Sequence, residues 1–299
     1  MPEMPEVQGL VDFLAERTTA RFPERPDGLA IEKASLASIA ALKTFDPPLT
    51  ALVGARIVDA SRHGKFVDLT AITPSHEALH LVFHLARAGW LRWYEQLPTT
   101  AIRPGRTPIA LRIALSDGSG FDLTEAGTKK SLAISVVRNP ADVPGIARLG
   151  PDPLADDFTE AVLTAILSGR RTQIKGVLRE QSVIAGIGNA YSDEILHAAR
   201  MSPYALAATL SPEEIAVLYA ALRATLAEAV AEASGHPPAE LKDAKRRGMQ
   251  VHARSGQACP VCGDTVRDVF FAERSLQYCP TCQTGGKPLA DRRLSRLLK

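Results

Sequence analysis

The four cysteines of the chain form two Cys-x-x-Cys pairs that belong to one pattern. Cys259 and Cys262 make the first pair, and Cys279 and Cys282 follow after 16 intervening residues. Each pair can turn two thiolates toward one metal ion, and two pairs complete a tetrahedral all-sulfur shell. Two disulfides or free thiols are the alternatives, and both fit an intracellular protein poorly. The spacing therefore predicts one structural Zn²⁺ ion, because four protein ligands leave no open position for catalysis.

Further short motifs are spread along the chain. It opens with Met-Pro-Glu-Met-Pro-Glu-Val, and Lys65 lies in Arg-His-Gly-Lys-Phe. Residues 149–154 read Leu-Gly-Pro-Asp-Pro-Leu, residues 186–194 read Gly-Ile-Gly-Asn-Ala-Tyr-Ser-Asp-Glu, and Arg274 lies between the cysteine pairs. In this order, from residue 2 to about residue 283, the motifs resemble the formamidopyrimidine-DNA glycosylase and endonuclease VIII family of base-excision repair enzymes.

The resemblance implies a fold and an activity. The fold is α+β: an N-terminal β-sandwich with a capping helix, then a helix–two-turn–helix domain, then a four-cysteine zinc ribbon. The activity is that of a bifunctional DNA glycosylase and DNA-(apurinic or apyrimidinic site) lyase. Such an enzyme removes an oxidised or otherwise damaged base through a Schiff base and cleaves the strand by β/δ-elimination. The implied partner is damaged DNA, double- or single-stranded, and we expect a monomer.

The resemblance also implies roles for particular residues. Pro2, once Met1 is removed, would be the nucleophile, Glu3 the general acid/base, and Lys65 a phosphate contact near the lesion. The residues implied to bind DNA are His84, Lys175, Asn189 and Arg274. A structural role is the alternative for His84 and Lys175, and Asn189 could also cap its helix.

The implied chemistry depends on a terminal secondary amine. With a pKa near the usual α-amino value of ~8, roughly a tenth of a terminal proline is uncharged at neutral pH. That fraction can attack C1′ of the sugar and displace the base, which gives an iminium adduct. Glu3 could protonate the sugar ring oxygen, and Lys65 offers a positive charge to a phosphate.

The positions that handle the opposite strand depart from the family pattern. After a base is flipped out, side chains must fill the gap and read the orphaned partner. In formamidopyrimidine-DNA glycosylases a Met after a His-Leu motif and an Asp-Pro-Arg-Arg-Phe-Gly loop do this, whereas here the positions read Arg87 and Glu125-Ala-Gly-Thr-Lys-Lys130. Residues 235–250, where a base-recognition loop would lie, are short and basic. We therefore expect weak discrimination of the opposite base, with 8-oxoguanine opposite cytosine not the preferred lesion.

Two other function classes are alternatives to a DNA glycosylase. A non-catalytic damaged- or single-stranded-DNA-binding protein on the same fold would fit the altered loops, but the intact Pro2, Glu3 and Lys65 favour catalysis. A tautomerase with Pro2 as general base fits neither the chain length nor the cysteine pattern.

Two kinds of segment must position these residues. Apolar spacing predicts a helix over residues 5–22, and β-rich segments with turns between them then predict a sandwich or flattened barrel. The expected strands are 51–58, 65–72, 78–94, 109–115, 121–124 and 131–137, with a hairpin turn at 117–120. Beyond a Pro/Gly-rich linker the pattern turns helical, and Ser211 and Glu214 form a capping box that opens a helix to about residue 234.

These segments predict five parts of the chain. They are a catalytic β-sandwich domain 1–138, a linker 139–150, a helix–two-turn–helix domain 151–247, a zinc ribbon 248–284 and a basic tail 285–299. The tail is either a DNA-contacting helix or a solvated end.

Composition and charge narrow the class of protein. The chain is 45% apolar and 23% charged, as in ordinary globular proteins. No apolar run approaches the ~20 residues that span a bilayer, and the start lacks the basic and then apolar stretch of a signal peptide. We therefore expect a cytoplasmic, nucleoid-associated protein of bacterial type with no membrane partner. Residues 240–299 carry a net charge of +6 and the remainder −4, so the C-terminal part either faces a polyanion or is a solvated basic face.

Overall fold

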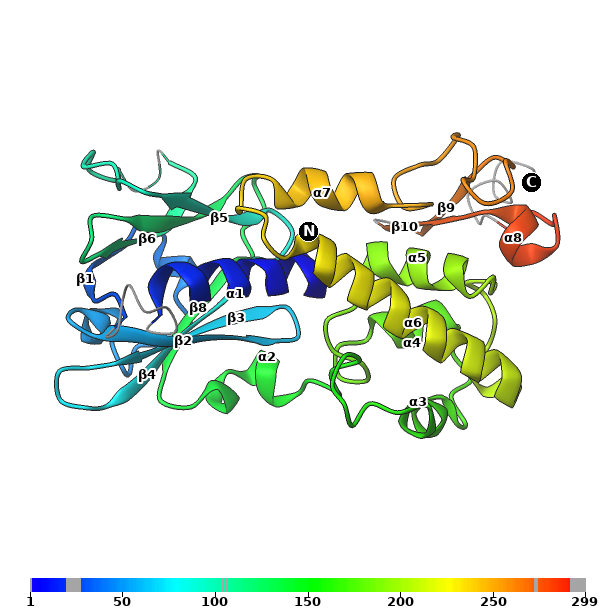
Figure 1. The fold of residues 1–299 in the computed structure, drawn as a ribbon, viewed down its shortest axis with the longest axis horizontal. Coiled ribbons are helices and arrows are strands. Elements are labelled where there is room, and N and C mark those ends of the chain that lie inside the picture. The colour runs from blue at the N-terminus through cyan, green and yellow to red at the C-terminus, as the bar shows by residue number, and fades with distance from the viewer. Residues whose placement is uncertain (1, 20–27, 104, 106, 272–273, 291–299) are drawn as a thin grey trace. The chain divides into compact units, whose positions relative to one another are not determined.

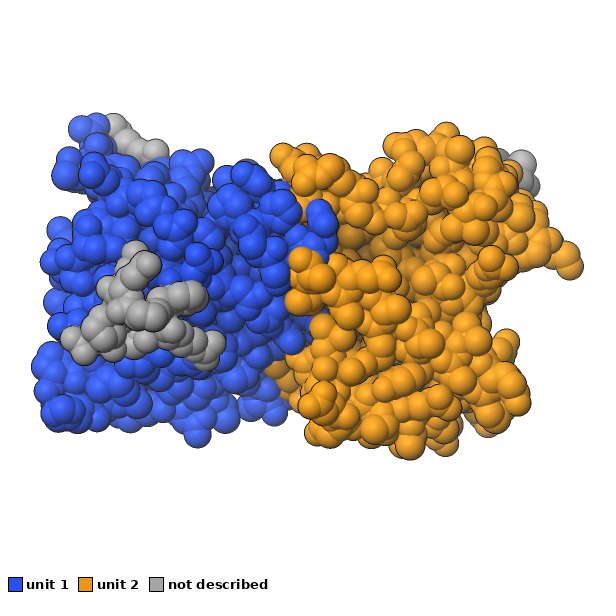
Figure 2. All heavy atoms as spheres, viewed as in Figure 1, with its two compact units in different colours: residues 1–148, 232–242 blue, residues 149–231, 243–299 orange. Residues whose placement is uncertain are grey.

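The computed structural model describes residues 2–19, 28–103, 105, 107–271 and 274–290, and most of its elements are labelled in Figure 1. The chain divides into two compact units, coloured separately in Figure 2. The first unit comprises residues 1–148 and 232–242, and the second comprises residues 149–231 and 243–299. Within the described part of the chain, no helix is both long enough and apolar enough to cross a membrane.

The first unit is a β-sandwich of two four-stranded antiparallel sheets. One sheet has the order β1-β6-β7-β5, with strands Ile31–Leu36, Ile109–Leu115, Gly120–Glu125 and Gly89–Tyr94. The other has the order β2-β3-β4-β8, with strands Arg56–His63, Phe66–Ile72, Ala78–His84 and Ala133–Val137. The sandwich predicted from the sequence is confirmed.

Alternating apolar residues build the core of the sandwich. Val67, Leu69 and Ala71 on β3 are each at most 1% exposed. Phe83 of one sheet and Phe121 of the other meet with ring centroids 6.4 Å apart. Burial of each large side chain contributes about 1.5–3 kcal/mol, so this core fixes the strand ends that carry the candidate site.

Helix α1, Met4–Thr18, packs against β2 and β3 of the sandwich. Its buried face consists of apolar residues at helical spacing, among them Val7, Leu10 and Leu14. A Cβ on Gly9 would lie 2.8 Å from the carbonyl oxygen of Ala233, so glycine allows a close approach of that backbone. The helix ends at Thr18, four residues before the predicted end, and residues 20–27 lie outside the described part.

The predicted strand over residues 78–94 is wrong as a single element. It is two strands, β4 and β5, that belong to different sheets. The connection from Leu85 to Ala88 contains no Gly or Pro, and Ala86 adopts φ +51°. The turn is closed by Gly89, where a Cβ would lie 2.2 Å from the Leu85 carbonyl oxygen. The sequence offered no turn signal there before Gly89.

The second unit is helical up to a short hairpin. Its main helices are α3 (Glu160–Leu167), α4 (Ile174–Arg179), α5 (Asn189–Ala198), α6 (Pro212–Ala233) and α7 (Leu241–Gly248), of which α6 and α7 each give two residues to the first unit. They are followed by β9 (Arg267–Phe271), β10 (Arg274–Tyr278) and α8 (Pro280–Thr284). The shorter helical segments of the chain are η1 (Ile39–Ala41), η2 (Leu49–Leu52), η3 (Pro140–Asp142), α2 (Pro144–Ala147) and η4 (Ala207–Thr209).

The predicted capping box opens α6. The backbone N–H of Ser211 donates to Glu214 Oε2 at 2.9 Å, and the N–H of Glu214 donates to Ser211 Oγ at 3.2 Å. Each bond satisfies a backbone donor that the helix itself leaves unpaired. This start, and the end at Ala233, agree with the predicted helix.

Candidate active site and zinc ribbon

Pro2 and Glu3 lie directly before α1 and are both buried. The backbone N–H of Glu3 donates to Glu6 Oε2 at 2.8 Å. Pro5 lies in the first turn of the helix, where its missing N–H leaves no hydrogen bond unmade. The start of α1 thereby fixes the backbone that carries the predicted nucleophile and acid/base.

Lys65 lies in the two-residue turn that joins β2 to β3. The pair His63 and Phe66 closes this hairpin, and Gly64 takes φ +57°, as hairpin turns with glycine at the first central position require. Lys65 is only 8% exposed. His63 Nε2 lies 3.2 Å from Asp68 Oδ2, a carboxylate that is 1% exposed. The turn is therefore held from within its own hairpin.

His84 ends β4, directly opposite Phe66 in the register of β3 and β4. The two rings have centroids 4.7 Å apart, and Phe66 also packs against Gly145, where a Cβ would lie 2.5 Å from the Phe66 Cζ. Burial, helped by the positive charge of Lys65, lowers the pKa of His84 to about 4. Lys65 and His84 therefore lie at the same end of the sheet, and the imidazole is neutral at pH 7.

The two loops that depart from the family pattern lie beside each other. Gly89 pairs with Glu125, and the N–H of Ala126 donates to the Ala88 carbonyl at 3.2 Å. The Glu125 carboxylate accepts from the N–H groups of Ser131 and Leu132, at 2.6 and 2.9 Å. The side chains exposed on these loops include Arg87, Thr128, Lys129 and Lys130.

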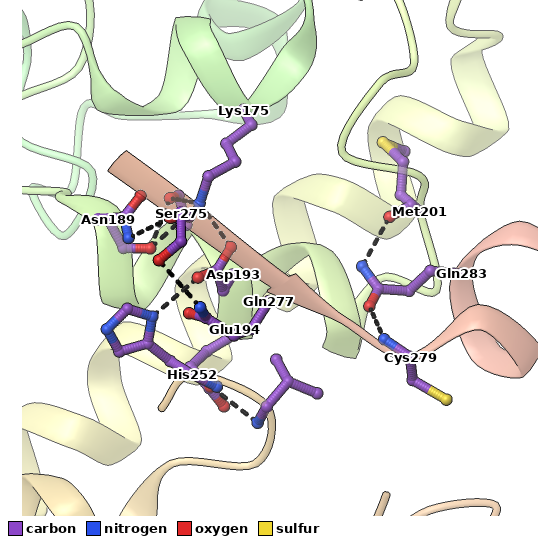
Figure 3. Close-up of polar contacts among 12 residues, drawn as sticks. Lys175, Asn189, Asp193, Glu194, Met201, His252, Ser275, Gln277, Cys279 and Gln283 are labelled. Carbon is purple, nitrogen blue, oxygen red and sulfur yellow. Dashed lines mark hydrogen bonds and ion pairs between the residues drawn. The ribbon is translucent and has the colours of Figure 1, made fainter. Parts of the chain in front are cut away.

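In the second unit, Lys175 is part of a buried polar cluster (Figure 3). Its Nζ donates to Asp193 Oδ1 at 2.5 Å, to Ser192 Oγ at 2.8 Å and to the Asn189 carbonyl at 3.2 Å. The other oxygen of Asp193 lies 2.8 Å from Nδ1 of His252. The side chain of Asp193 is 0% exposed and that of Lys175 7%. The ammonium thereby joins α4 to the first turn of α5.

Asn189 is the first residue of α5, and Gly188 before it is the N-cap. The Asn189 side chain does not cap the helix. Its Nδ2 donates to the Ser275 carbonyl on β10 at 2.8 Å (Figure 3), while its buried Oδ1 has no hydrogen-bond partner among the described residues. The predicted position of Arg274 is the first residue of β10, opposite Phe271, but its side chain lies outside the described part.

Glu194, the neighbour of Asp193 on α5, holds the segment that leads to the ribbon. Its carboxylate accepts the N–H groups of Gln250, Val251 and His252 at 2.7, 3.0 and 2.7 Å. Burial raises the pKa of Glu194, and the three N–H groups oppose that rise. The sequence motif contained Asp193 and Glu194, but nothing in it indicated their distant partners.

The four cysteine Sγ atoms lie within 4.8 Å of one another. Sγ of Cys259 is 3.9 Å from that of Cys282, and Sγ of Cys262 is 3.3 Å from that of Cys279. Zn–S bonds of about 2.3 Å in a tetrahedron place sulfurs roughly 3.8 Å apart, so the four thiolates fit Zn²⁺. His197 of α5 has its Nε2 3.3 Å from the Cys259 Sγ and can orient that ligand.

Gln283 ties the ribbon to the helices. Its Nε2 donates to the Met201 carbonyl at 3.0 Å, and its Oε1 accepts the Cys279 N–H at 2.9 Å (Figure 3). A substitution at this buried amide would leave two backbone groups without partners.

The comparisons with known proteins cover nearly the whole chain. The formamidopyrimidine-DNA glycosylase N-terminal domain matches residues 1–130, the H2TH domain of that enzyme matches residues 149–237, and the zinc finger found in FPG and IleRS matches residues 256–285. The formamidopyrimidine-DNA glycosylase of Symbiobacterium thermophilum is 34% identical over 293 residues, which cover 95% of this chain and 89% of that protein. The chain belongs to the formamidopyrimidine-DNA glycosylase family. The family predicted from the sequence motifs is confirmed.

Other proteins of the formamidopyrimidine-DNA glycosylase family are also similar to this chain. An uncharacterized formamidopyrimidine-DNA glycosylase-like protein of Mycobacterium tuberculosis is 55% identical over 159 residues, which cover 53% of this chain and 99% of that protein. The crystal structure of MutM (FPG) from Thermus thermophilus is similar with a TM-score of 0.76 and 28% identity, covering 96% and 100% of the two chains. Wild-type Lactococcus lactis Fpg, in complex with DNA that contains N7-benzyl-Fapy-dG, shares the fold with a TM-score of 0.80 at 23% identity and covers 95% and 100%.

Family membership fixes the coarse function. The chain is a DNA-repair glycosylase with an α+β fold of β-sandwich, helix–two-turn–helix domain and zinc finger, and it takes a single structural zinc ion on its four cysteines. Pro2, Glu3, Lys65 and His84 fall in the match to the N-terminal domain, and Lys175 and Asn189 in that to the H2TH domain. The match to the zinc finger contains Arg274.

Proposed function

We propose that the chain is a bifunctional DNA glycosylase and AP lyase that uses the imino nitrogen of Pro2 as its nucleophile. The observation that carries this proposal is the placement of Pro2 and Glu3: both are buried directly before α1, in the part of the chain that matches the N-terminal domain of formamidopyrimidine-DNA glycosylases. Removal of Met1, which lies outside the described residues, frees the amine. DNA bound by the structural relatives supports damaged DNA as the substrate.

The proposed reaction has two stages. The lone pair of the Pro2 nitrogen attacks C1′, the bond from C1′ to the base breaks with its electrons, and the base leaves with a proton. Glu3 supplies a proton to the sugar ring oxygen, and the C1′–O4′ bond breaks with its electrons as the nitrogen lone pair forms the iminium. Glu3 later accepts a proton. The iminium acidifies the C2′ proton, whose loss expels the 3′ phosphate, and δ-elimination then expels the 5′ phosphate.

DNA contacts are assigned to residues of both units. Lys65 and the neutral His84 lie at one strand end and can offer N–H donors to a phosphate. Asn189 starts α5, where backbone N–H groups favour an anion, and Arg274 is assigned a second phosphate. Lys175 makes three hydrogen bonds within its unit, so we assign its effect on DNA to the placement of Asn189.

The exposed loops support a proposal for the lesion. Arg87, Thr128, Lys129 and Lys130 offer neither an aromatic nor a methionine wedge, and their cations can bind phosphate. We therefore assign oxidised pyrimidines in both single- and double-stranded DNA as substrates. A panel of lesion-bearing oligonucleotides tests this: strict dependence on duplex DNA with cytosine opposite 8-oxoguanine would contradict it.

We also propose that the chain has five parts with different tasks. We assign catalysis to residues 1–138, a linker to 139–150, DNA binding to 151–247, the zinc ribbon to 248–284 and a basic tail to 285–299, of which 291–299 lie outside the described part. We also propose that the protein acts as a monomer on nucleoid DNA in the cytoplasm.

Borohydride trapping on an abasic-site oligonucleotide tests the nucleophile. Wild-type protein should form a covalent adduct, Pro2→Gly should form at least about 100-fold less, and Glu3→Gln should trap an adduct but remove damaged bases poorly. The Pro2→Gly and Glu3→Gln variants should still bind the oligonucleotide. A wild-type protein that binds but leaves no adduct would identify the non-catalytic DNA-binding alternative instead.

A further inference from the structure

Arg62 on β2 makes hydrogen bonds to two different elements of the first unit. Its Nε donates to Gln8 Oε1 on α1 at 2.9 Å. Its Nη1 donates to the carbonyl oxygen of Gly64 at 3.1 Å. One guanidinium therefore links helix α1 to the turn between β2 and β3.

Both ends of this link lie near groups that the proposed reaction uses. Gln8 is about 6 Å along the helix from its first residue, and Pro2 and Glu3 are buried immediately before that residue. At the other end, Gly64 is bonded directly to Lys65. The link therefore runs between the helix that directly follows the proposed nucleophile and the turn that contains the proposed phosphate-binding lysine.

The partners of Arg62 are themselves held in place. Nε2 of Gln8 donates to Asp12 Oδ1 at 2.8 Å, which turns the amide oxygen toward the guanidinium. On the hairpin side, the residue before Gly64 is His63, and its imidazole is held by the buried Asp68. An arginine with two fixed acceptors sets a separation, because its planar guanidinium presents N–H groups in fixed directions.

We propose that Arg62 is a positioning residue that sets the separation between the Pro2 nitrogen and the Lys65 ammonium. The inference rests on the proposed function, since it assigns a task only if Pro2 and Lys65 take part in the reaction. A reacting group displaced by 1 Å can cost about 100-fold in rate. Loss of this single link, with the sandwich intact, is expected to slow the reaction about tenfold.

A double-mutant cycle on Arg62 and Gln8 tests the proposal. Arg62→Lys keeps the charge but cannot bridge two acceptors in a fixed fork, and Gln8→Met keeps a straight-chain helix former without the acceptor. Each should lower the single-turnover rate of borohydride trapping on an abasic oligonucleotide about tenfold while the Kd changes less than twofold. The double variant should be no slower than the slower single variant, because both break the same link.

Arg56→Lys is the matched control. Arg56 lies on the same strand, and its Nη1 donates to a carbonyl, that of Gly28, at 3.1 Å. This bond lies at the other end of β2, so the trapping rate of Arg56→Lys should equal that of the wild type.

The outcomes separate this inference from the proposed function. A wild-type protein without an adduct overturns both. A normal adduct with unchanged rates in Arg62→Lys and Gln8→Met, or with effects that multiply in the double variant, overturns the positioning role alone. A raised Kd at an unchanged rate would make Arg62 a phosphate contact and also overturn it. Thermal unfolding checks each fold, and Gln8→Met tests the link even if Arg62→Lys does not fold.

Discussion

The Lys65 turn and the start of α5, two of the proposed phosphate-binding positions, are stabilised in different ways. The turn is held by partly exposed side chains: that of His63 is 33% exposed, and Arg62 bonds to uncharged groups. The start of α5 rests on the buried ion pair of Lys175 and Asp193. Removal of one partner from a buried ion pair strongly destabilises the fold, because the other charge stays buried without a counter-ion. A part-exposed hydrogen bond contributes little to the free energy of unfolding. Substitutions should therefore affect catalysis near the turn and folding near α5.

Removal of zinc should give the largest loss of folded structure and DNA binding. The loss of structure should be confined to the zinc ribbon, which lies in the same unit as α5. Structural zinc sites contribute about 10–16 kcal/mol of apparent binding free energy in small domains. Cys279→Ser should lose the metal, unfold residues 251–271 and 274–283 and weaken DNA binding more than about tenfold as phosphate contacts are lost. Hydrogen exchange should show residues 56–72 unchanged, and equal loss of protection there would break the distinction.

Removal of the Asp193 carboxylate should be the next largest effect. Asp193→Ala leaves the Lys175 ammonium buried without its counter-ion, at a cost of about 3–5 kcal/mol in the free energy of unfolding. Arg62→Lys should cost only about 1 kcal/mol. The double variant Lys175→Met/Asp193→Leu should recover most of the stability, since no charge stays buried. Urea denaturation measures all three, and similar costs for Asp193→Ala and Arg62→Lys would count against the comparison.

His84, which pairs with Phe66 next to the Lys65 turn, should make the stability of the protein depend on pH. The pKa of His84 falls from 6.5 to about 4 in the folded protein. Below pH 6.5 the unfolded chain binds a proton that the folded chain does not, so the stability that is present above pH 6.5 is lost toward pH 4, by at most about 3 kcal/mol. His84→Gln should flatten this part of the profile in pH-dependent urea titrations. An unaltered profile would show that other groups cause the loss.

The smallest expected effect concerns the exposed loop that contains Arg87. Arg87→Ala should remove one phosphate contact and so reduce the slope of log Kd against log salt concentration by about 1. The excision rate should barely change, because Arg87 is exposed. Fluorescence anisotropy at several salt concentrations measures the slope, and an unchanged slope would remove Arg87 from the DNA contacts.

Much of the fold could be predicted because local signals agreed with the final structure. The predicted strand 109–115 has the observed bounds, and the Ser211 capping box begins its helix as expected. Strand β1 was missed because Glu32 and Lys33 interrupt its apolar pattern. The sequence predicts one strand over 78–94 because neither Gly nor Pro marks the turn at Ala86, which adopts φ +51°.

The candidate site was only partly readable from the sequence. The cysteine spacing predicted the sulfur cluster, since the ligands are set by local motifs. His252 and Asp193 are separated by 59 residues, and Arg62 and Gln8 by 54, so their pairing depends on tertiary packing that no spacing rule encodes. The helix-capping alternative for Asn189 does not hold because Gly188 occupies the cap and β10 supplies an acceptor.

The contact between Gly145 and Phe66 has a consequence for the connector that leads out of the sandwich. A side chain at position 145 would meet the Phe66 ring at 2.5 Å, so any larger residue must push the ring aside. Phe66 is the residue after Lys65, and its displacement would carry the hairpin tip with it. The segment that contains Gly145 therefore packs against the hairpin of the first unit, and among relatives the size of the residue at 145 should vary inversely with that at 66.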